Sequence, residues 1–342
     1  MNPLDLLQEL VSVPGPPGQE GLVRDVLAAH LEHLGYAHST DAKGNLIVRL
    51  GSSSGPKVVV TAHMDEIALF VRQINADGTL KVSPLGGIFP WKLGEGPVTI
   101  MASSGHFDAV LGVGSIHTES NLSSAKRAKS DVLTWEMTTV TTGLSKDELK
   151  KRGVRLGTRV VVAPSRRALT KFGDFVSGYF LDDRADLVSW LLVLEALQGS
   201  SLDVTFVATT SEEVGGEGAL YFLTSELPDI CIALELAPQV PDSPIVIDAR
   251  PVVWVNDAYA AMPPHLGEVL DSVSGESGIE LQYQALSRGG SDASCSAAKG
   301  LCAHPITLGL PMENSHGYEI IHRDSMRALA DFTVALLKRL GC

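Results

Sequence analysis

The sequence of 342 residues lacks the features that mark exported and membrane-spanning proteins. Its four cysteines form no C-x-x-C pair and are too few to staple a chain of this size, so we expect reduced thiols in a cytoplasmic protein. No apolar run approaches the roughly 18 residues that a transmembrane helix needs. The first residues carry acids where a signal peptide carries basic side chains, so we expect neither export nor a membrane partner.

Positive charge is scarce as well. Lys and Arg number 27 against 40 Asp and Glu, and the resulting net charge of −13 disfavours nucleic acid as a partner. No G-x-G-x-x-G motif or P-loop stands between a predicted strand and a helix, which disfavours a nucleotide-dependent enzyme. Hydrophobic residues make up 44% of the chain, so we expect a packed core, and the length allows two domains.

Much of the chain alternates between strand-like and helix-like segments. Short apolar runs without polar alternation predict buried strands at 57–62, 175–181, 204–210 and 230–234. Helical periodicity predicts helices at 3–12, 19–34, 184–198 and 217–226. This alternation is typical of a parallel sheet with helices on both faces.

The stretch at 71–164 has a different pattern. Gly and Pro turns separate short strand candidates at 79–82, 98–102, 109–113 and 132–140. A capping-box spacing, Ser145-x-x-Glu148, predicts a helix near 146–152. The sequence therefore predicts an α/β domain, made of residues 1–70 and 165–342, that is interrupted by a small β-rich domain.

The predicted insertion has a basic flank. Between Asn121 and Lys171, 12 Lys or Arg residues are offset by only four acids. Trp135 is the only aromatic residue among these cations, which argues against a nucleic-acid site. We interpret the flank as a solvated or subunit-facing surface.

Polar side chains follow four of the predicted strands directly. They are His63, Asp65 and Glu66 after the first strand, Asp182 and Asp183 after the second, Glu212 and Glu213 after the third, and Glu235 after the fourth. Ligands of an open parallel sheet bind outside the carboxyl ends of its strands, so we expect these residues to share one edge. Any one of them has an ordinary interpretation, such as a helix cap or a solvated turn. Together, crowded carboxylates require a cationic partner, and a pair of divalent metal ions is the simplest one.

These residues lie in segments that resemble the M42 family of metallo-aminopeptidases, which includes the tetrahedral and glutamyl aminopeptidases. The segments are AHMDEI at 62–67, LDDRAD at 181–186, SEEVGGEGA at 211–219, GGSDAS at 289–294 and NSHGYEIIH at 314–322. The resemblance runs over nearly the whole chain. It implies a di-metal peptidase catalytic domain with a phosphorylase/hydrolase-like α/β fold. The inserted β-rich domain would serve oligomer assembly, with dimers assembling into a dodecamer.

The resemblance also implies five metal ligands. One ion would be bound by His63, Asp182 and Glu235. The other would be bound by Asp182, Glu213 and His316, so that Asp182 bridges the two ions. Only the resemblance selects His316 over the other histidines, because spacing alone does not. Two divalent ions per subunit are implied, with Zn²⁺ expected and Co²⁺ or Mn²⁺ as alternatives.

The same resemblance assigns the catalytic roles. Glu212 would be the general base for an attacking water, and Asp65 would orient the ring of His63. The implied reaction is the hydrolysis of N-terminal residues from peptides. Two alternatives remain at this point: a di-metal deacylase or amidase that acts on N-acylated or modified small substrates, and a non-enzymatic scaffold. The retained Glu212 argues against the scaffold.

Four positions depart from the family pattern. Glu235 stands where the family usually has Asp, and Asp186, Ala68 and Gly317 replace Gly, Gly and Ser. The longer side chain of Glu235 shifts its carboxylate, which keeps the deacylase alternative open. We expect these departures to affect substrate preference more than the chemistry.

Overall fold

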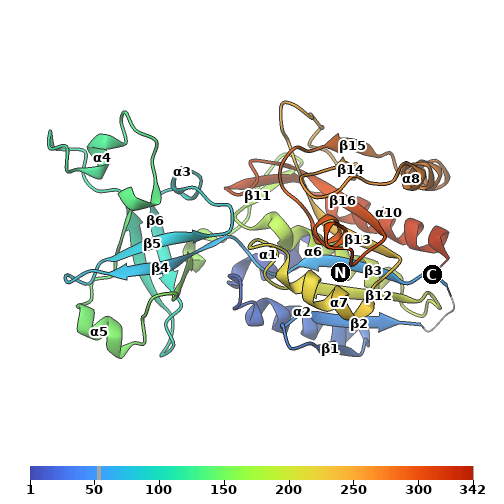
Figure 1. Ribbon diagram of the computed structural model, residues 1–342, viewed down its shortest axis with the longest axis horizontal. Helices are drawn as coiled ribbons and strands as arrows, with labels where there is room; N and C mark the ends of the chain where they lie inside the picture. Colours follow the sequence, from blue (N-terminus) through green and yellow to red (C-terminus); the bar gives the residue numbers. More distant parts are fainter. Residues whose placement is uncertain (52–54, 342) are drawn as a thin grey trace.

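The computed structural model describes residues 1–51 and 55–341, and within them the chain forms a large mixed sheet with helices and a smaller β-barrel beside it (Figure 1). The strands of the sheet are β1 (His38–Thr40), β2 (Leu46–Leu50), β3 (Val58–His63), β10 (Thr170–Phe172), β11 (Phe175–Gly178), β12 (Val204–Thr209), β13 (Ile230–Pro238), β14 (Val252–Asn256), β15 (Gln282–Ala285), β16 (His304–Glu313) and β17 (Glu319–His322). Their order is β1-β2-β12-β3-β13-β16-β17-β11-β10, and β14 joins β15 to β16. We call this sheet and its helices the α/β part.

The centre of the sheet is parallel, as predicted. β12, β3, β13 and β16 pair in parallel, and every residue of β3 is buried. β3 lacks polar alternation because helices cover both faces of the sheet.

Two predicted strands need correction. The strand predicted at 175–181 ends at Gly178 and pairs antiparallel with β17 and β10 rather than in parallel. β17 is in turn antiparallel to β16, so β11 still runs in the same direction as the parallel core. The strand predicted to end before Glu235 continues to Pro238, because β16 pairs with it over its whole length.

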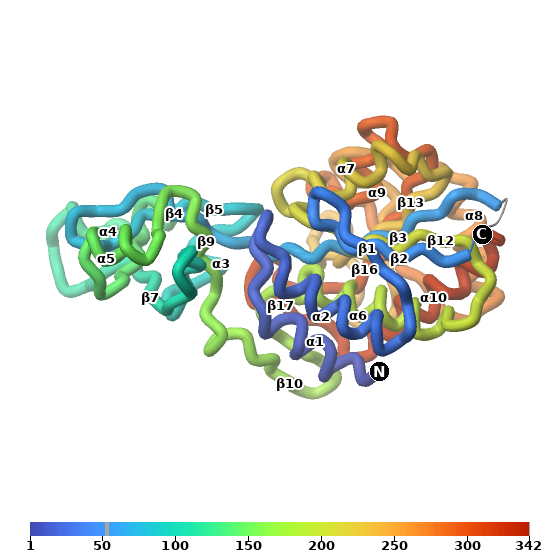
Figure 2. The backbone as a smooth tube through the Cα atoms, turned by 90° about the horizontal axis from the view of Figure 1, so that it is seen from below, coloured from blue at the N-terminus to red at the C-terminus, as the bar shows by residue number. Residues whose placement is uncertain are grey.

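Helices cover the two faces unequally (Figures 1 and 2). One face carries α1 (Pro3–Ser12), α2 (Gly21–Leu34), α6 (Leu181–Ala196), α8 (Pro264–Ser277) and α10 (Ser325–Leu340). The other carries α7 (Glu217–Glu226) and α9 (Asp292–Ala298). α6 is buried from Leu181 through Leu194, and its Trp190 packs edge-on against Phe206 of β12. This central helix fixes the position of the acids at its N-terminus.

The barrel is closed and contains six strands in the order β4-β5-β8-β7-β6-β9. Their bounds are β4 (Ala68–Ile74), β5 (Leu80–Leu85), β6 (Gly96–Ile100), β7 (Phe107–Gly112), β8 (Thr139–Thr141) and β9 (Arg159–Val162). Three short helices accompany them: α3 (Pro90–Leu93), α4 (Ser124–Arg127) and α5 (Lys146–Lys151). The barrel has a hydrophobic core of its own.

One local prediction in the barrel is confirmed and one is wrong. The capping box of Ser145 and Glu148 is present at the start of α5. The strand predicted at 132–140 is reduced to β8, because Trp135–Met137 forms a 3₁₀ turn. The indole N–H of Trp135 donates to the backbone oxygen of Ile88 at 3.0 Å, which holds this turn against the segment that follows β5.

No helix among the described residues has both the length and the apolar character needed to cross a membrane. Cys231, Cys295 and Cys302 are free thiols, and Cys342 lies outside the described residues.

Candidate metal centre

The five predicted ligands meet at one edge of the sheet. His63 is the last residue of β3, and Ala233 of β13 pairs with Thr61, which puts Glu235 level with His63. The other three lie at the start of α6 (Asp182), in the turn after β12 (Glu213) and in the turn between β16 and β17 (His316). These elements leave the same edge because β11, which leads into α6, runs in the direction of the parallel strands.

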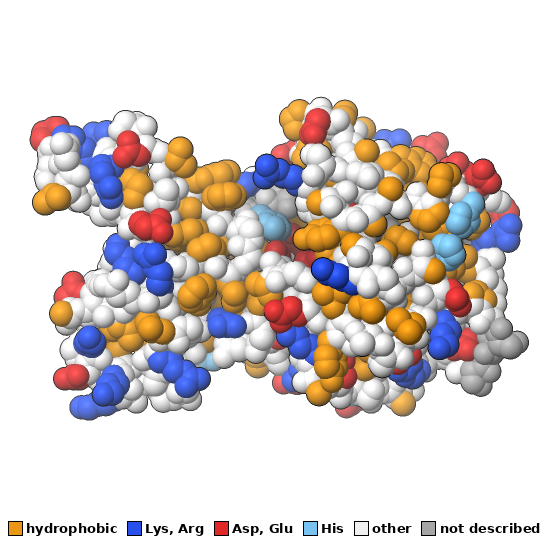
Figure 3. Space-filling view, in the orientation of Figure 1, with side chains coloured by type: hydrophobic (Ala, Val, Ile, Leu, Met, Phe, Trp, Pro, Cys, Tyr) orange, Lys and Arg blue, Asp and Glu red, His pale blue; other side chains and the backbone are white. Residues whose placement is uncertain are grey.

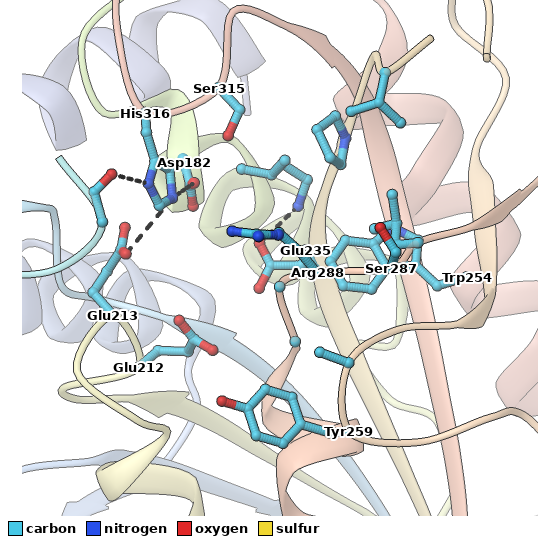
Figure 4. Close-up of a pocket in the computed structure, with 18 of the residues that line it drawn as sticks. Asp182, Glu212, Glu213, Glu235, Trp254, Tyr259, Ser287, Arg288, Ser315 and His316 are labelled. Atoms are coloured by element: carbon cyan, nitrogen blue, oxygen red, sulfur yellow. Dashed lines mark hydrogen bonds and ion pairs between the residues drawn. The ribbon is translucent and has the colours of Figure 1, made fainter. Parts of the chain in front are cut away.

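Asp182 lies between the two histidines. One of its oxygens is 3.1 Å from Nε2 of His63 and the other is 3.3 Å from Nε2 of His316. The latter nitrogen is also 3.6 Å from a carboxylate oxygen of Glu213 (Figure 4). Two groups of ligand atoms result, and within each group all atoms lie within 4.8 Å of one another. The groups are His63, Asp182, Asp183 and Glu235, and Asp182, Glu213 and His316.

Asp183 belongs to the first group, although from the sequence it was expected only at the sheet edge and not as a ligand. Its Oδ2 accepts the backbone N–H of His63 at 2.7 Å. A second acid beside a predicted ligand is the only sequence signal for this contact, and it also fits a helix cap.

Both histidines offer the same nitrogen to the cluster. Nδ1 of His63 is 3.1 Å from the backbone oxygen of Asp65, and Nδ1 of His316 is 2.9 Å from that of Gly87. A carbonyl oxygen only accepts, so each Nδ1 carries a proton, and in the neutral form of each ring Nε2 has the lone pair. This tautomer is the one that a metal-binding histidine needs.

Asp65 contacts the ring of His63, as predicted, and two backbone N–H groups as well. Its Oδ1 is 3.4 Å from the ring of His63, but its two oxygens also accept the backbone N–H groups of Glu212 and Glu213 at 2.9 and 3.1 Å. The turn that carries both glutamates is therefore fixed by a carboxylate from the segment that follows β3.

Glu20 extends the same arrangement. Its Oε1 accepts the backbone N–H of Ser211 at 3.1 Å, and Ser211 has a left-handed φ of 56°. Three successive N–H groups at 211–213 are thus bound by two buried carboxylates. Burial raises the pKa of Glu20 above its ordinary value. The role of Glu20 was not predicted from the sequence, because 191 residues separate it from Ser211.

A buried ion-pair network joins two of the segments that carry ligands. Glu66 follows Asp65, and its carboxylate pairs with Arg184 at 2.9 Å and with Arg167. Arg184 also donates to the backbone oxygen of Met64. Removing one member would leave a buried charge without a partner, which typically costs several kcal/mol, roughly 3–5.

Two of the candidate ligand carboxylates, those of Glu213 and Glu235, resist ionisation. Asp182 differs, because its burial is outweighed by contacts with His316 and His63, which lower its pKa. Burial, opposed by His316 and reinforced by Asp182, raises the pKa of Glu213 to about 7. Burial and Asp182 raise the pKa of Glu235 well above its ordinary value. One oxygen of Glu213 is buried and accepts no hydrogen bond. Holding these acids ionised near neutral pH therefore requires added positive charge, and the residues present fit divalent cations.

The histidines titrate in the opposite sense. Burial lowers the pKa of His63, but Asp183, Asp182 and Asp65 outweigh it, so that its pKa lies well above the ordinary value. The charge of Glu213 likewise raises the pKa of His316 well above its ordinary value, against the effect of burial. Protons and metal ions therefore compete for the same nitrogens.

The cluster opens into a cavity of about 1030 Å³ that also reaches the barrel. Its lining includes Glu212, apolar residues of the α/β part, and the segment that follows β5. The space is larger than a single amino acid needs, since pockets for whole small molecules span roughly 300–1,000 Å³.

Comparison with known proteins shows to which protein family the chain belongs. The sequence model of the family described as M42 glutamyl aminopeptidase matches residues 44–332. The chain belongs to the M42 peptidase family. It is therefore a peptidase, an enzyme that hydrolyses peptide bonds, and the scaffold alternative falls.

Relatives and solved structures agree with this assignment. The lysyl aminopeptidase of Pyrococcus furiosus is 29% identical over 91% of this chain and 90% of its own. An aminopeptidase from Desulfurococcus kamchatkensis superposes with a TM-score of 0.87 at 27% identity, over 98% of this chain and 94% of its own. The TET1 peptidase of Pyrococcus horikoshii does so with a TM-score of 0.86 at 25% identity, over 98% of both chains. The matches span the M42 catalytic fold together with its barrel.

Proposed function

We propose that this M42 peptidase removes N-terminal residues from peptides by means of two divalent metal ions bound in the cluster. The observation that supports this most strongly is the position of Asp182, whose two oxygens each face the Nε2 atom of a different histidine. Shared carboxylates of this kind hold two metals close enough to act on one substrate.

The ligands divide as the resemblance implies. His63, Asp182 and Glu235 would hold one ion, and Asp182, Glu213 and His316 the other. When bound, the ions supply a Lewis acid for the scissile carbonyl and lower the pKa of an attacking water to around 7. Zn²⁺ suits this mixture of imidazole and carboxylate ligands, and Co²⁺ and Mn²⁺ are the alternatives that metal analysis distinguishes.

Glu212 is the proposed general base. It lines the cavity but belongs to neither ligand group. Glu213 points toward His316, whereas the adjacent Glu212 points in another direction (Figure 4). Burial, opposed by His63, raises the pKa of Glu212 well above its ordinary value, so this carboxylate readily accepts a proton. It would take the proton from the attacking water and pass it to the leaving amine.

A panel of substrates tests the proposal. Aminoacyl-anilides and N-acyl amino acids are to be compared with Zn²⁺, Co²⁺ or Mn²⁺ added. An aminopeptidase hydrolyses the anilides and is blocked by an acyl group on the amine. Hydrolysis of the N-acyl compounds alone would instead indicate the deacylase alternative. The side chain of the best anilide would give the preferred N-terminal residue.

We also propose that residues 71–164 form a domain that assembles subunits. The barrel closes on a core of its own, and Lys and Arg gather on its surface (Figure 3). The TET1 peptidase of Pyrococcus horikoshii assembles into a tetrahedron or an octahedral shell. By analogy, we expect dimers of this chain to form a dodecamer, and light scattering would test this.

A cytoplasmic location is part of the proposal as well. Its support is chemical: three of the described cysteines are free thiols, which persist in a reducing compartment. Cell fractionation would test it.

A further inference from the structure

The cavity beside the metal cluster has two unlike sides. On the α/β side, Leu236, Trp254 and Leu286 enclose an apolar part of the cavity and are only 5%, 6% and 6% exposed. The charged Asp242 and Arg288 line the same side nearer to solvent, since both are exposed. Trp254 lies across the cavity from His316 (Figure 4). On the barrel side, Phe89 and Trp91 line the same cavity but are 56% and 55% exposed. Large aromatic side chains left this open usually mark a binding surface.

The two exposed rings form a stacked pair. Their centroids are 5.4 Å apart and their planes differ by 16°. They flank Pro90 at the start of α3, and hydrophobic side chains are visible on the barrel side of the hollow between the two parts (Figure 3). The pair therefore presents apolar area to the cavity without packing into a core.

The backbone that carries the stacked pair is anchored by buried side chains and hydrogen bonds. Pro90 and Leu93 are buried in the barrel. The Nζ of Lys92 donates to Oδ1 of Asn314 at 2.7 Å and to the backbone oxygen of Ser315 at 3.0 Å. Hydrogen bonds to the backbone oxygens of Ile88 and Leu93 hold both ends of the turn. Binding to such a surface costs little ordering of the protein.

The same segment is held close to the metal cluster. Gly87 accepts the hydrogen bond from His316, and a Cβ atom on Gly87 would lie 2.9 Å from the Nδ1 of that ring. The rings of Phe89 and Trp91 follow two and four residues later. Their placement relative to the cluster is therefore fixed by the contact that orients a proposed ligand.

We propose that Phe89 and Trp91 bind the part of the peptide beyond its first residue and favour apolar or aromatic side chains there. The inference rests on the proposed aminopeptidase function. The first residue ends the substrate and fits the enclosed side, whereas the rest of the peptide must leave toward solvent past the open side. Rigid aromatic rings suit that path, because they offer large contact area at small entropic cost.

The test compares substrates that share the preferred first residue X. They are the amide X-NH₂, the peptide X-Gly-Gly-Gly and the peptide X-Phe-Gly-Gly. The variants are Phe89→Ala, Trp91→Ala and their double, with Tyr221→Ala as a control for an exposed ring of α7 outside the cavity. Light scattering monitors the size of each protein.

We expect X-Phe-Gly-Gly to be the best substrate of the natural protein. Each alanine substitution is expected to reduce kcat/KM for that peptide by roughly 2- to 10-fold, mainly through KM, while hydrolysis of X-NH₂ stays unchanged. Phe89→Leu and Trp91→Leu, which keep apolar bulk, are expected to restore part of the loss. The Tyr221→Ala protein is expected to match the natural one.

Three results would overturn the inference. Equal losses on X-NH₂ and on the peptides would mean that the rings support the site rather than bind substrate. A change in particle size with unchanged KM would assign the rings to a contact between copies of the chain. A natural protein that hydrolyses none of the three substrates would refute the proposed function, and the inference with it.

Discussion

The α/β part and the barrel contribute different things to one site. Every member of the two candidate ligand groups comes from the α/β part, at the edge where its strands end. The barrel contributes a backbone oxygen, that of Gly87, and the exposed rings of Phe89 and Trp91. In the proposed mechanism the chemistry thus belongs to the sheet edge, while the barrel orients one candidate ligand and lines the space for substrate.

This division reflects what each architecture offers. Parallel strands bring residues from distant parts of the chain to one edge, which suits a cluster of acids and histidines. A closed barrel has no free sheet edge and keeps its interior for its own core, so it reaches the cavity only through a connecting segment.

The largest effect is expected from loss of the metals. Chelation is expected to abolish hydrolysis, and the Asp182→Asn protein is expected to lose both ions, because this residue belongs to both groups. Elemental analysis alongside an anilide assay checks both. Asp242→Asn is the matched control, since Asp242 is an exposed acid of the same cavity outside both groups. A fully active protein without metal would refute the mechanism.

Substituting the adjacent Glu212 and Glu213 one at a time separates metal binding from proton transfer within the α/β part. Glu212→Gln is expected to keep both metals and lower kcat by roughly 10²- to 10⁴-fold, as loss of a general base does. Glu213→Gln is expected to lose metal as well as rate, because Glu213 belongs to a ligand group. Metal content and turnover are measured on both proteins. If the Glu212→Gln protein lost its metal, the two roles would have to be exchanged.

A smaller effect is expected from the barrel side. The new Cβ of Gly87→Ala would lie 2.9 Å from Nδ1 of His316, so the ring must move. Displacing a contact that orients a ligand typically costs roughly 10- to 100-fold in metal affinity or activity. Gly112→Ala is the control within the barrel, where the added atom meets only an ordinary contact at 3.5 Å. Metal titration of both proteins gives the comparison.

An unchanged metal affinity in the Gly87→Ala protein would contradict the proposed division of roles between the α/β part and the barrel. It would mean that the α/β part positions His316 without help, and that the barrel serves substrate and assembly alone.

The sequence predicts the sheet edge well, for a physical reason. Local apolar runs mark buried strands, and the polar residues after them must appear at the strand ends, so His63 and Glu213 could be found from their neighbours. Resemblance, and not pattern, supplied His316, because a turn between antiparallel strands carries no periodic signal. The pairing of β11 with its neighbours could not be predicted either, since the run at 175–181 fits parallel and antiparallel pairing alike.

The contacts that orient the site were not predictable. Glu20 binds the turn at Ser211 across 191 residues of sequence, and Gly87 meets His316 across 229. Neither residue belongs to a motif with a local physical signature. Such contacts follow from the packing of the whole chain, which a pattern of neighbours does not contain.

The smallest effect is expected from screening or removing the charges in the basic flank of the barrel. It tests the proposed role of the barrel in assembly. If cations of the barrel meet acidic surface on a neighbouring copy, raising the salt concentration is expected to shift the protein toward smaller particles in light scattering. Exposed charge pairs contribute only roughly 0.2–1 kcal/mol each, so the shift is expected to be gradual.

Neutralising Arg127, Lys129 and Lys150 to Gln is expected to lower the salt concentration at which this shift toward smaller particles occurs. The matched control neutralises three exposed cations of the α/β part: Lys299, Lys338 and Arg339. Equal shifts in the two triple variants would show that net charge, rather than the barrel, governs assembly.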